Sequence, residues 1–181
     1  MSRLKPIDPA SATGKAKNLL DAVKAKMGLV PNMTKVMANA PAVLEGYLGF
    51  SGALSGGLLD AKTREQLALV VAQDNRCDYC LSAHSAIGKM VGLSDPQILA
   101  SREGHGINDR TTAALAFARQ VLDSKGQVTD PQLEAVRAAG FSDGEVAEII
   151  AHVALNVLTN YFNIATNVDI DFPKVSFAKA S

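Results

Sequence analysis

Apolar and polar positions recur along the chain with the period of an α-helix, and glycine or proline interrupts the pattern at short intervals. Residues 11–27 repeat apolar side chains every three or four positions, which is typical of an amphipathic helix, and Gly28 ends it. A short segment lies between Pro31 and Pro41, and a further helix runs from Pro41 to Gly56. The first third of the chain is therefore predicted to be helical.

The central and later segments continue this pattern. Asp60 is placed to cap a helix from 61 to about 74, and the apolar run at 67–72 predicts that this helix is buried. The next helix ends near Gly92. The remaining helices open with capping residues, namely Ser94, Asn108 or Asp109, Thr129 and Ser142. No alternating strand pattern exceeds a few residues, so we expect an all-α fold of about eight or nine helices in one domain, 1–181.

The last helical segment, residues 142–167, has an unusually wide apolar surface. At 100° per residue, its apolar side chains cover roughly half the circumference or more. They are Val146, Ala147, Ile150, Ala151, Val153, Ala154, Leu155, Val157, Leu158, Tyr161, Phe162 and Ile164. One neighbouring helix cannot cover so much surface, so we expect the chain to form a homo-oligomer.

A polar stripe occupies the rest of that helix. It consists of Glu145, Glu148, His152, Asn156, Thr159 and Asn163. A stripe of this kind is usually a solvated face, and the alternative is that it lines a site. Another helix carries three glycines, Gly46, Gly49 and Gly52, each of which costs about 1 kcal/mol in a helix interior. Either a neighbouring helix packs closely against them, or that helix is loosely formed.

Composition narrows the class of protein. The chain of 181 residues has 18 basic and 18 acidic residues and no lysine or arginine cluster, so we expect no nucleic-acid partner. No signal-like stretch follows the start, and no run approaches the roughly 20 apolar residues that span a bilayer, so we expect no membrane association. A cytoplasmic protein is the expectation. Two cysteines are too few for a disulfide scaffold, which makes them candidates for chemistry.

The two cysteines form a CxxC pair with other reactive side chains at helical spacing. Cys77, Cys80 and His84 lie at i, i+3 and i+7, which places them in one stripe of a helix. Glu65 belongs to the preceding predicted helix, twelve positions before Cys77. The pair is expected at a turn before a helix, where free backbone N–H groups stabilise a thiolate.

Three interpretations compete for this cluster. The cysteines could be small buried residues beside a hydrogen-bonded histidine. They could bind zinc with His84 and with Glu65 or water as the fourth ligand, although structural zinc ligands usually come from loops or separate elements. The third interpretation is a cycle between dithiol and disulfide, which needs no cofactor. We favour the third, because it also accounts for the neighbouring residues.

His84 and Glu65 are suited to move protons for such a cycle. His84 lies one turn after Cys80, so its imidazole can take the proton of that thiol. Glu65 shares a helix face with small apolar residues, which predicts a partly desolvated carboxylate and a role as proton relay. Alternatively, Glu65 is an ordinary first-turn glutamate. The helix dipole favours Cys77 as the nucleophile, whereas the nearby base favours Cys80, and we give the base more weight.

The array of Glu65, Cys77, Cys80 and His84 resembles the motif of the alkylhydroperoxidase D (AhpD) family, within the carboxymuconolactone decarboxylase superfamily. The segments GLVPNMTKVMANAPAVLEGY and NYFNIATNVDIDFP also resemble members of this superfamily, so the resemblance covers most of the chain. It implies an all-α, AhpD-like fold, a dimer, trimer or hexamer, and thiol-dependent reduction of organic hydroperoxides or hydrogen peroxide. By this resemblance Cys80 is the peroxidatic thiol, Cys77 resolves it, and His84 and Glu65 relay protons.

The same resemblance leaves two points open. The reductant in the family can be a thiol or a protein-bound lipoyl group, and the decarboxylase branch of the superfamily acts on a lactone without a cysteine pair. The pair in this chain argues against that branch. The chain also carries Tyr79 where the AhpD pattern has a second histidine, and a phenol cannot exchange protons near neutral pH as an imidazole does.

Overall fold

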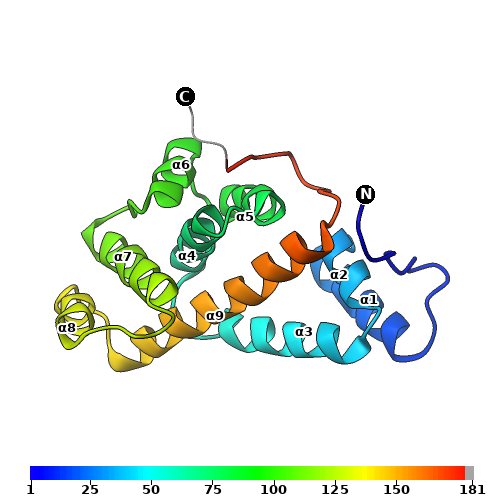
Figure 1. The fold of residues 1–181 in the computed structure, drawn as a ribbon, viewed down its shortest axis with the longest axis horizontal. Coiled ribbons are helices and arrows are strands. Elements are labelled where there is room, and N and C mark those ends of the chain that lie inside the picture. The colour runs from blue at the N-terminus through cyan, green and yellow to red at the C-terminus, as the bar shows by residue number, and fades with distance from the viewer. Residues whose placement is uncertain (178–181) are drawn as a thin grey trace.

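The computed structural model describes residues 1–177, and these form nine helices and no strand (Figure 1). The helices are α1 (Gly14–Met27), α2 (Asn32–Met37), α3 (Pro41–Ser55), α4 (Ala61–Asp74), α5 (Asp78–Met90), α6 (Asp95–Glu103), α7 (Asp109–Asp123), α8 (Asp130–Ala138) and α9 (Asp143–Thr166). The predicted all-α class is confirmed. The first helix begins at Gly14 rather than Ser11, and residues 178–181 of the predicted domain lie outside the described residues.

Helix α4 is the central element of the fold. It packs against α5, α6, α7 and α9, and every side chain from Leu67 to Ala72 is buried, as the apolar run predicts. A helix that is apolar on all sides must be covered on all sides. Leu69 and Ala72 belong to one apolar cluster with α1, α2, α3 and α5, whereas Leu67, Val70 and Val71 belong to a second cluster with α7, α8 and α9. The helix therefore joins two cores.

The helix starts follow the predicted capping residues. The side chain of Asp60 accepts a hydrogen bond from the Thr63 backbone N–H at 3.0 Å. Ser94, Asn108, Thr129 and Ser142 are the N-caps of α6, α7, α8 and α9. These caps satisfy backbone donors that the first turn of a helix leaves free, so local sequence determines where α4 and α6 to α9 begin.

The C-terminal segment that follows α9 lies across α5. Its Val175 N–H donates to the Ser82 hydroxyl at 2.9 Å, and its Phe177 N–H donates to the Asp78 carboxylate at 2.8 Å. We call residues 169–177 the C-terminal strap. Figure 1 shows this strap (red) running from the end of α9 past α5. It is held by side chains of the helix that carries the CxxC motif.

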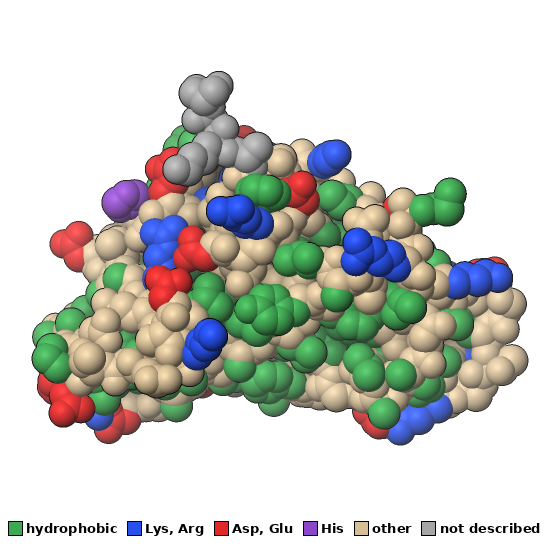
Figure 2. All heavy atoms as spheres, viewed as in Figure 1, with side chains coloured by type: hydrophobic (Ala, Val, Ile, Leu, Met, Phe, Trp, Pro, Cys, Tyr) green, Lys and Arg blue, Asp and Glu red, His purple; other side chains and the backbone are tan. Residues whose placement is uncertain are grey.

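Helix α9 is polar toward the interior and apolar toward solvent over much of its length. Ile150, Leu158, Tyr161 and Ile164 are 42–58% exposed, although Val146, Ile149 and Val153 are in the core. Figure 2 shows hydrophobic side chains gathered over the middle of this face, across α9 and α3. Within residues 1–177 no helix combines the length and apolar character that would let it cross a membrane.

Helix α3 adds to the same apolar face. Only Leu44 among its residues is fully covered, while Val43 and Phe50 are exposed. A Cβ atom added at any of the three helical glycines would have no neighbour within 4 Å. Close packing against another helix of the same chain therefore does not account for these glycines.

Candidate active site

The turn between α4 and α5 positions the two cysteines. Arg76 has a φ of 57°, which is unusual for a residue with a side chain and turns the backbone sharply after α4. The Asn75 side-chain Nδ2 donates to Asn160 Oδ1 at 3.0 Å and ties this turn to α9. Cys77 is then the N-cap of α5, so it lies at the start of the helix rather than inside it. The predicted turn before a helix is confirmed.

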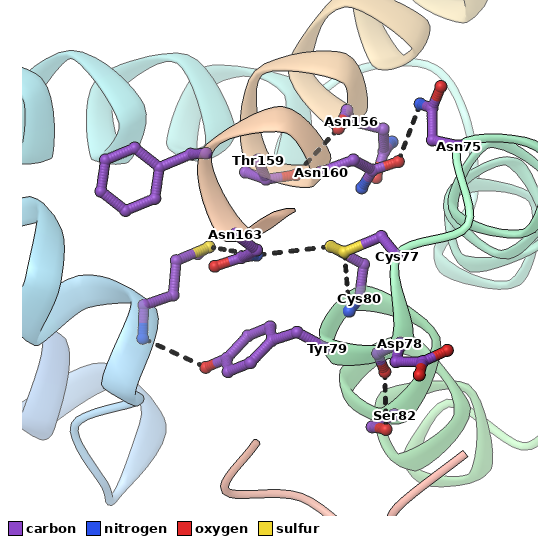
Figure 3. Close-up of a disulfide and its surroundings, with 12 residues drawn as sticks. Asn75, Cys77, Asp78, Tyr79, Cys80, Ser82, Asn156, Thr159, Asn160 and Asn163 are labelled. Atoms are coloured by element: carbon purple, nitrogen blue, oxygen red, sulfur yellow. Dashed lines mark hydrogen bonds between the residues drawn. A yellow bond between two sulfur atoms is a disulfide. The ribbon is translucent and has the colours of Figure 1, made fainter. Parts of the chain in front are cut away.

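Cys77 and Cys80 form a disulfide, with their Cα atoms 5.3 Å apart. Both residues are almost fully buried. Each sulfur accepts one hydrogen bond: Cys77 Sγ from the Cys80 backbone N–H at 3.2 Å, and Cys80 Sγ from Asn163 Nδ2 at 3.3 Å (Figure 3). The first bond is a capping bond at the positive end of α5. Each thiolate would thus have a donor in the reduced state.

His84 and Glu65 form a hydrogen-bonded pair. His84 Nδ1 is 2.8 Å from Glu65 Oε2, and the two side chains are only 23% and 15% exposed. The carboxylate holds the imidazole in one orientation and leaves Nε2 available for other contacts. His84 and Cys80 line the same cavity. The structure therefore brings together all four of the predicted site residues around α4 and α5.

Tyr79 is buried in a separate polar network. Its hydroxyl accepts a hydrogen bond from the Met33 N–H at 3.2 Å and donates to Asp171 of the C-terminal strap at 2.9 Å. Burial raises the pKa of Tyr79 above its usual value, and Asp171 raises it further. The Phe172 ring packs edge-on against Tyr79, with centroids 5.8 Å apart. Tyr79 thus connects the motif helix to α2 and to the strap.

The polar stripe of α9 faces the site, so its interpretation as a solvated face is wrong for most of its length. His152, Asn156, Thr159 and Asn163 are all between 3% and 7% exposed. From the sequence we placed Asn163 on this stripe but predicted no specific role for it. Helical spacing assigns Asn163 to this stripe, but it does not say whether the stripe points inward, because that depends on how α9 packs against α4 and α5.

Three hollows surround the motif. Cys80, His84, Asn163 and Phe172 line a cavity of about 70 Å³. A second cavity of about 260 Å³ lies on the other side of His84 and is lined by residues that include Glu65 and His152. A groove of about 560 Å³ borders Cys77. The two cysteines therefore line different spaces.

His152 is a buried histidine in the second cavity. Burial lowers its pKa, and the nearby Arg64 guanidinium lowers it further. Among the described residues its Nε2 has no hydrogen-bond partner. His152 is therefore a neutral imidazole near neutral pH.

The zinc interpretation finds no support in this arrangement. Within residues 1–177 no group of three or more histidine, cysteine, aspartate or glutamate side chains is placed to hold a metal ion. The sulfur atoms of the two cysteines are bonded to each other, and the Nδ1 atom of His84 is hydrogen-bonded to Glu65, so these atoms are already engaged.

The fold and the site define an all-helical protein with a buried CxxC disulfide. Residues 41–124 match the model of the carboxymuconolactone decarboxylase family. The resemblance to this superfamily and to its AhpD-like members is therefore confirmed. A segment of 46 residues is 48% identical to an uncharacterized protein of Haemophilus influenzae, and it spans 25% of this chain and 41% of that protein.

Solved structures share the fold over nearly the whole chain. An AhpD-core, peroxidase-related protein from Ralstonia eutropha JMP134 is 25% identical, with a TM-score of 0.85, and the match covers 94% of this chain and 92% of that one. A peroxidase-related protein from Silicibacter sp. TM1040 is 23% identical, with a TM-score of 0.82 and coverage of 93% and 91%. The debrominase Bmp8, solved with 2,3,4-tribromopyrrole, is 18% identical, with a TM-score of 0.78 and coverage of 94% and 92%.

Proposed function

We propose that the protein is a thiol-dependent peroxidase that reduces organic hydroperoxides or hydrogen peroxide. The Cys80 thiolate attacks the outer oxygen of the hydroperoxide, so that an S–O bond forms and the O–O bond breaks. The two electrons come from sulfur, and the leaving alkoxide or hydroxide takes a proton from His84. The Cys77 thiol then loses its proton and its sulfur attacks the Cys80 sulfenic acid; the S–S bond forms, the S–O bond breaks, and the leaving hydroxide takes that proton to become water.

The observation that carries this proposal is the placement of the Cys77–Cys80 disulfide beside the Glu65–His84 pair. A cavity that holds both Cys80 and an imidazole supplies a nucleophile and a proton donor at one place. The cavity of about 70 Å³ suits a small oxidant. The disulfide itself is the product of the proposed cycle.

The cycle needs a reductant. We also propose that the protein forms a homo-oligomer. A dithiol of the lipoyl type, or another thiol, would reduce the disulfide by exchange, with one sulfur attacked and the other released as a thiolate. We place the protein in the cytoplasm, where such thiols are available. The exposed apolar face of α3 and α9 supports a homo-oligomer, as a dimer, trimer or hexamer.

Rapid mixing of the reduced protein with an alkyl hydroperoxide tests the function. We expect one hydroperoxide to be consumed and two free thiols to be lost per chain, with catalytic turnover when a dithiol is supplied. Cys80→Ser should abolish consumption, and Cys77→Ser should stop after one equivalent with a sulfenic acid at Cys80. Wild-type turnover in Cys80→Ser would refute the assignment. Lactone decarboxylation without loss of thiols would instead favour the decarboxylase branch.

A further inference from the structure

The side-chain amide of Asn163 has an orientation that the surrounding sulfurs determine. Its Nδ2 lies 3.3 Å from Cys80 Sγ and 3.2 Å from Met33 Sδ. Neither a disulfide sulfur nor a thioether carries a hydrogen, so each can only accept. The amide must therefore present its NH2 group to these sulfurs and its oxygen to the other side.

The donor contact to Cys80 is worth little in the oxidised state and more in the reduced state. A disulfide sulfur is a weak acceptor, whereas hydrogen bonds to an ionised acceptor are about twice as strong as those between neutral groups. Asn163 is 3% exposed, so water does not screen this contact. The position of the amide therefore favours the thiolate of Cys80 once the disulfide is reduced.

The oxygen of the same amide is also unusual. Asn163 Oδ1 is buried and has no hydrogen-bond partner among the described residues. A buried acceptor without a partner has lost its hydrogen bonds to water and gained none in return, so such groups are rare in folded proteins. Figure 3 shows this oxygen turned away from the disulfide, on the side where the Tyr79 ring lies. Asn163 and Tyr79 both line the cavity that contains Cys80.

We propose that Asn163 is a catalytic residue: its Nδ2–H group stabilises the Cys80 thiolate, and its Oδ1 accepts a hydrogen bond from the O–H group of a hydroperoxide in the cavity. This inference rests on the proposed peroxidase function. A hydroperoxide has one O–H donor, and the unpartnered oxygen belongs to the same amide whose Nδ2 contacts the sulfur that attacks the O–O bond. One amide thus serves both reactants.

The donor role is tested by the pKa of Cys80. In a Cys77→Ser background, Cys80 is the only thiol, and serine keeps an N-cap acceptor for α5. The pH dependence of alkylation by iodoacetamide then gives the thiol pKa. We expect Asn163→Leu to raise this pKa by about one unit or more, since the loss of a charge-assisted hydrogen bond disfavours the thiolate. An unchanged pKa would overturn the donor role.

The acceptor role is tested by comparing two oxidants above the pKa of every variant. At such pH all of the Cys80 is thiolate, so differences in ionisation no longer matter. Asn163→Leu should react about tenfold more slowly with tert-butyl hydroperoxide, which carries an O–H group. It should react no more slowly with methyl methanethiosulfonate, which has none, because a thiolate of higher pKa is the better nucleophile. Equal losses with both reagents would overturn the acceptor role.

Two further variants serve as controls for the measured pKa of Cys80. Asn163→Asp is nearly isosteric and replaces the donor with a carboxylate, so it should raise the Cys80 pKa more than Asn163→Leu does. Thr166→Val changes a buried side chain one turn later whose hydroxyl donates to the Phe162 carbonyl, and it should leave the pKa of Cys80 unchanged. If wild-type protein reduces no hydroperoxide, the proposed function fails, whereas the alkylation experiment still decides the donor role.

Discussion

At the scale of single residues, the site separates groups that can move protons from groups that hold the structure. His84 and Glu65 form a partly buried pair beside the Cys80 cavity. Tyr79 instead donates to Asp171 and accepts from the Met33 N–H, with its pKa raised by burial. A phenol with a raised pKa stays protonated near neutral pH. The proton relay of the proposed cycle would therefore depend on the imidazole and the carboxylate.

We expect His84→Ala and Glu65→Gln each to lower peroxide turnover about a hundredfold, which is the low end of a general acid–base contribution. Tyr79→Phe should lower turnover by less than about tenfold, or roughly 1.4 kcal/mol of barrier. It should instead reduce the free energy of unfolding by about 1–3 kcal/mol, because the Met33 N–H and the Asp171 carboxylate lose a buried partner. Turnover and melting temperature measured on the three variants separate these roles. A loss in Tyr79→Phe as large as that in His84→Ala would place the phenol in the relay.

A second prediction concerns pH and the buried imidazole of His152. Arg64 and His84 disfavour its protonated form, as does burial, while Glu65 and Glu148 partly oppose them. Its pKa in the folded protein lies below the unfolded value of about 6.5, so the unfolded chain binds more protons in this range. Stability should therefore fall as the pH drops below about 6.5.

The control for this prediction is an exposed histidine. Urea denaturation at a series of pH values should show a flatter decline below about pH 6.5 for His152→Gln than for wild type. His105→Gln should keep the wild-type slope, because His105 is solvent-exposed. A decline in His152→Gln as steep as that of wild type would show that other groups cause it.

At the scale of elements, the C-terminal strap forms one wall of the Cys80 cavity. Phe172 lines this cavity and packs on Tyr79, whereas Phe177 lies farther along the strap with its ring under Arg76, at 5.9 Å. Both aromatic residues are half-buried. Only one of them limits the space available to a substrate.

We expect Phe172→Ala to raise the rate with a bulky aryl hydroperoxide, relative to hydrogen peroxide, by at least about threefold, because the cavity of about 70 Å³ becomes larger. Phe177→Ala is the matched control: it should weaken the strap but leave this ratio unchanged. The ratio of second-order rate constants for the two oxidants is the measurement. A ratio that rises equally in both variants would mean that loosening of the strap, not cavity size, controls access.

Most elements could be predicted from local sequence, whereas the placement of the strap and of the α9 stripe could not. Caps such as Asp60 and Ser142 act within one turn, so sequence spacing alone indicates them. The four site residues lie on α4, at the N-cap of α5 and on α5, at fixed spacings, so their closeness was also predictable. Asn163 and Asp171 reach the site from positions far along the chain. Spacing says nothing about such contacts, because they depend on how the helices pack.

At the scale of the whole molecule, the apolar face of α3 and α9 predicts self-association. Gly46 lies on the same side of α3 as the exposed Val43 and Phe50, whereas Gly52 lies about 120° around that helix. Neither glycine has a neighbour within 4 Å of an added Cβ atom. A second copy that packs closely at Gly46 would explain why a costly glycine is present there.

We expect Gly46→Ala to weaken the assembly although alanine favours the helix by about 1 kcal/mol. Gly52→Ala should provide the same gain in helix propensity without a change in assembly. Sedimentation velocity over a range of concentrations measures both variants against wild type. A wild-type protein that stays monomeric at micromolar concentration would refute the homo-oligomer, and equal behaviour of the two variants would exclude Gly46 from the interface.

Because Cys80 lines the small cavity and Cys77 borders the groove of about 560 Å³, the oxidant and the electron donor of the proposed cycle can approach the disulfide from different sides. Side chains of both charges line this groove: Arg76 and Lys174 are basic, and Asp78 and Asp169 are acidic. Oxidant and electron donor would then occupy different spaces and leave in turn. Steady-state kinetics should be ping-pong, with parallel double-reciprocal lines and no inhibition of peroxide reduction by excess donor. Competition between the two would place both at a single entrance.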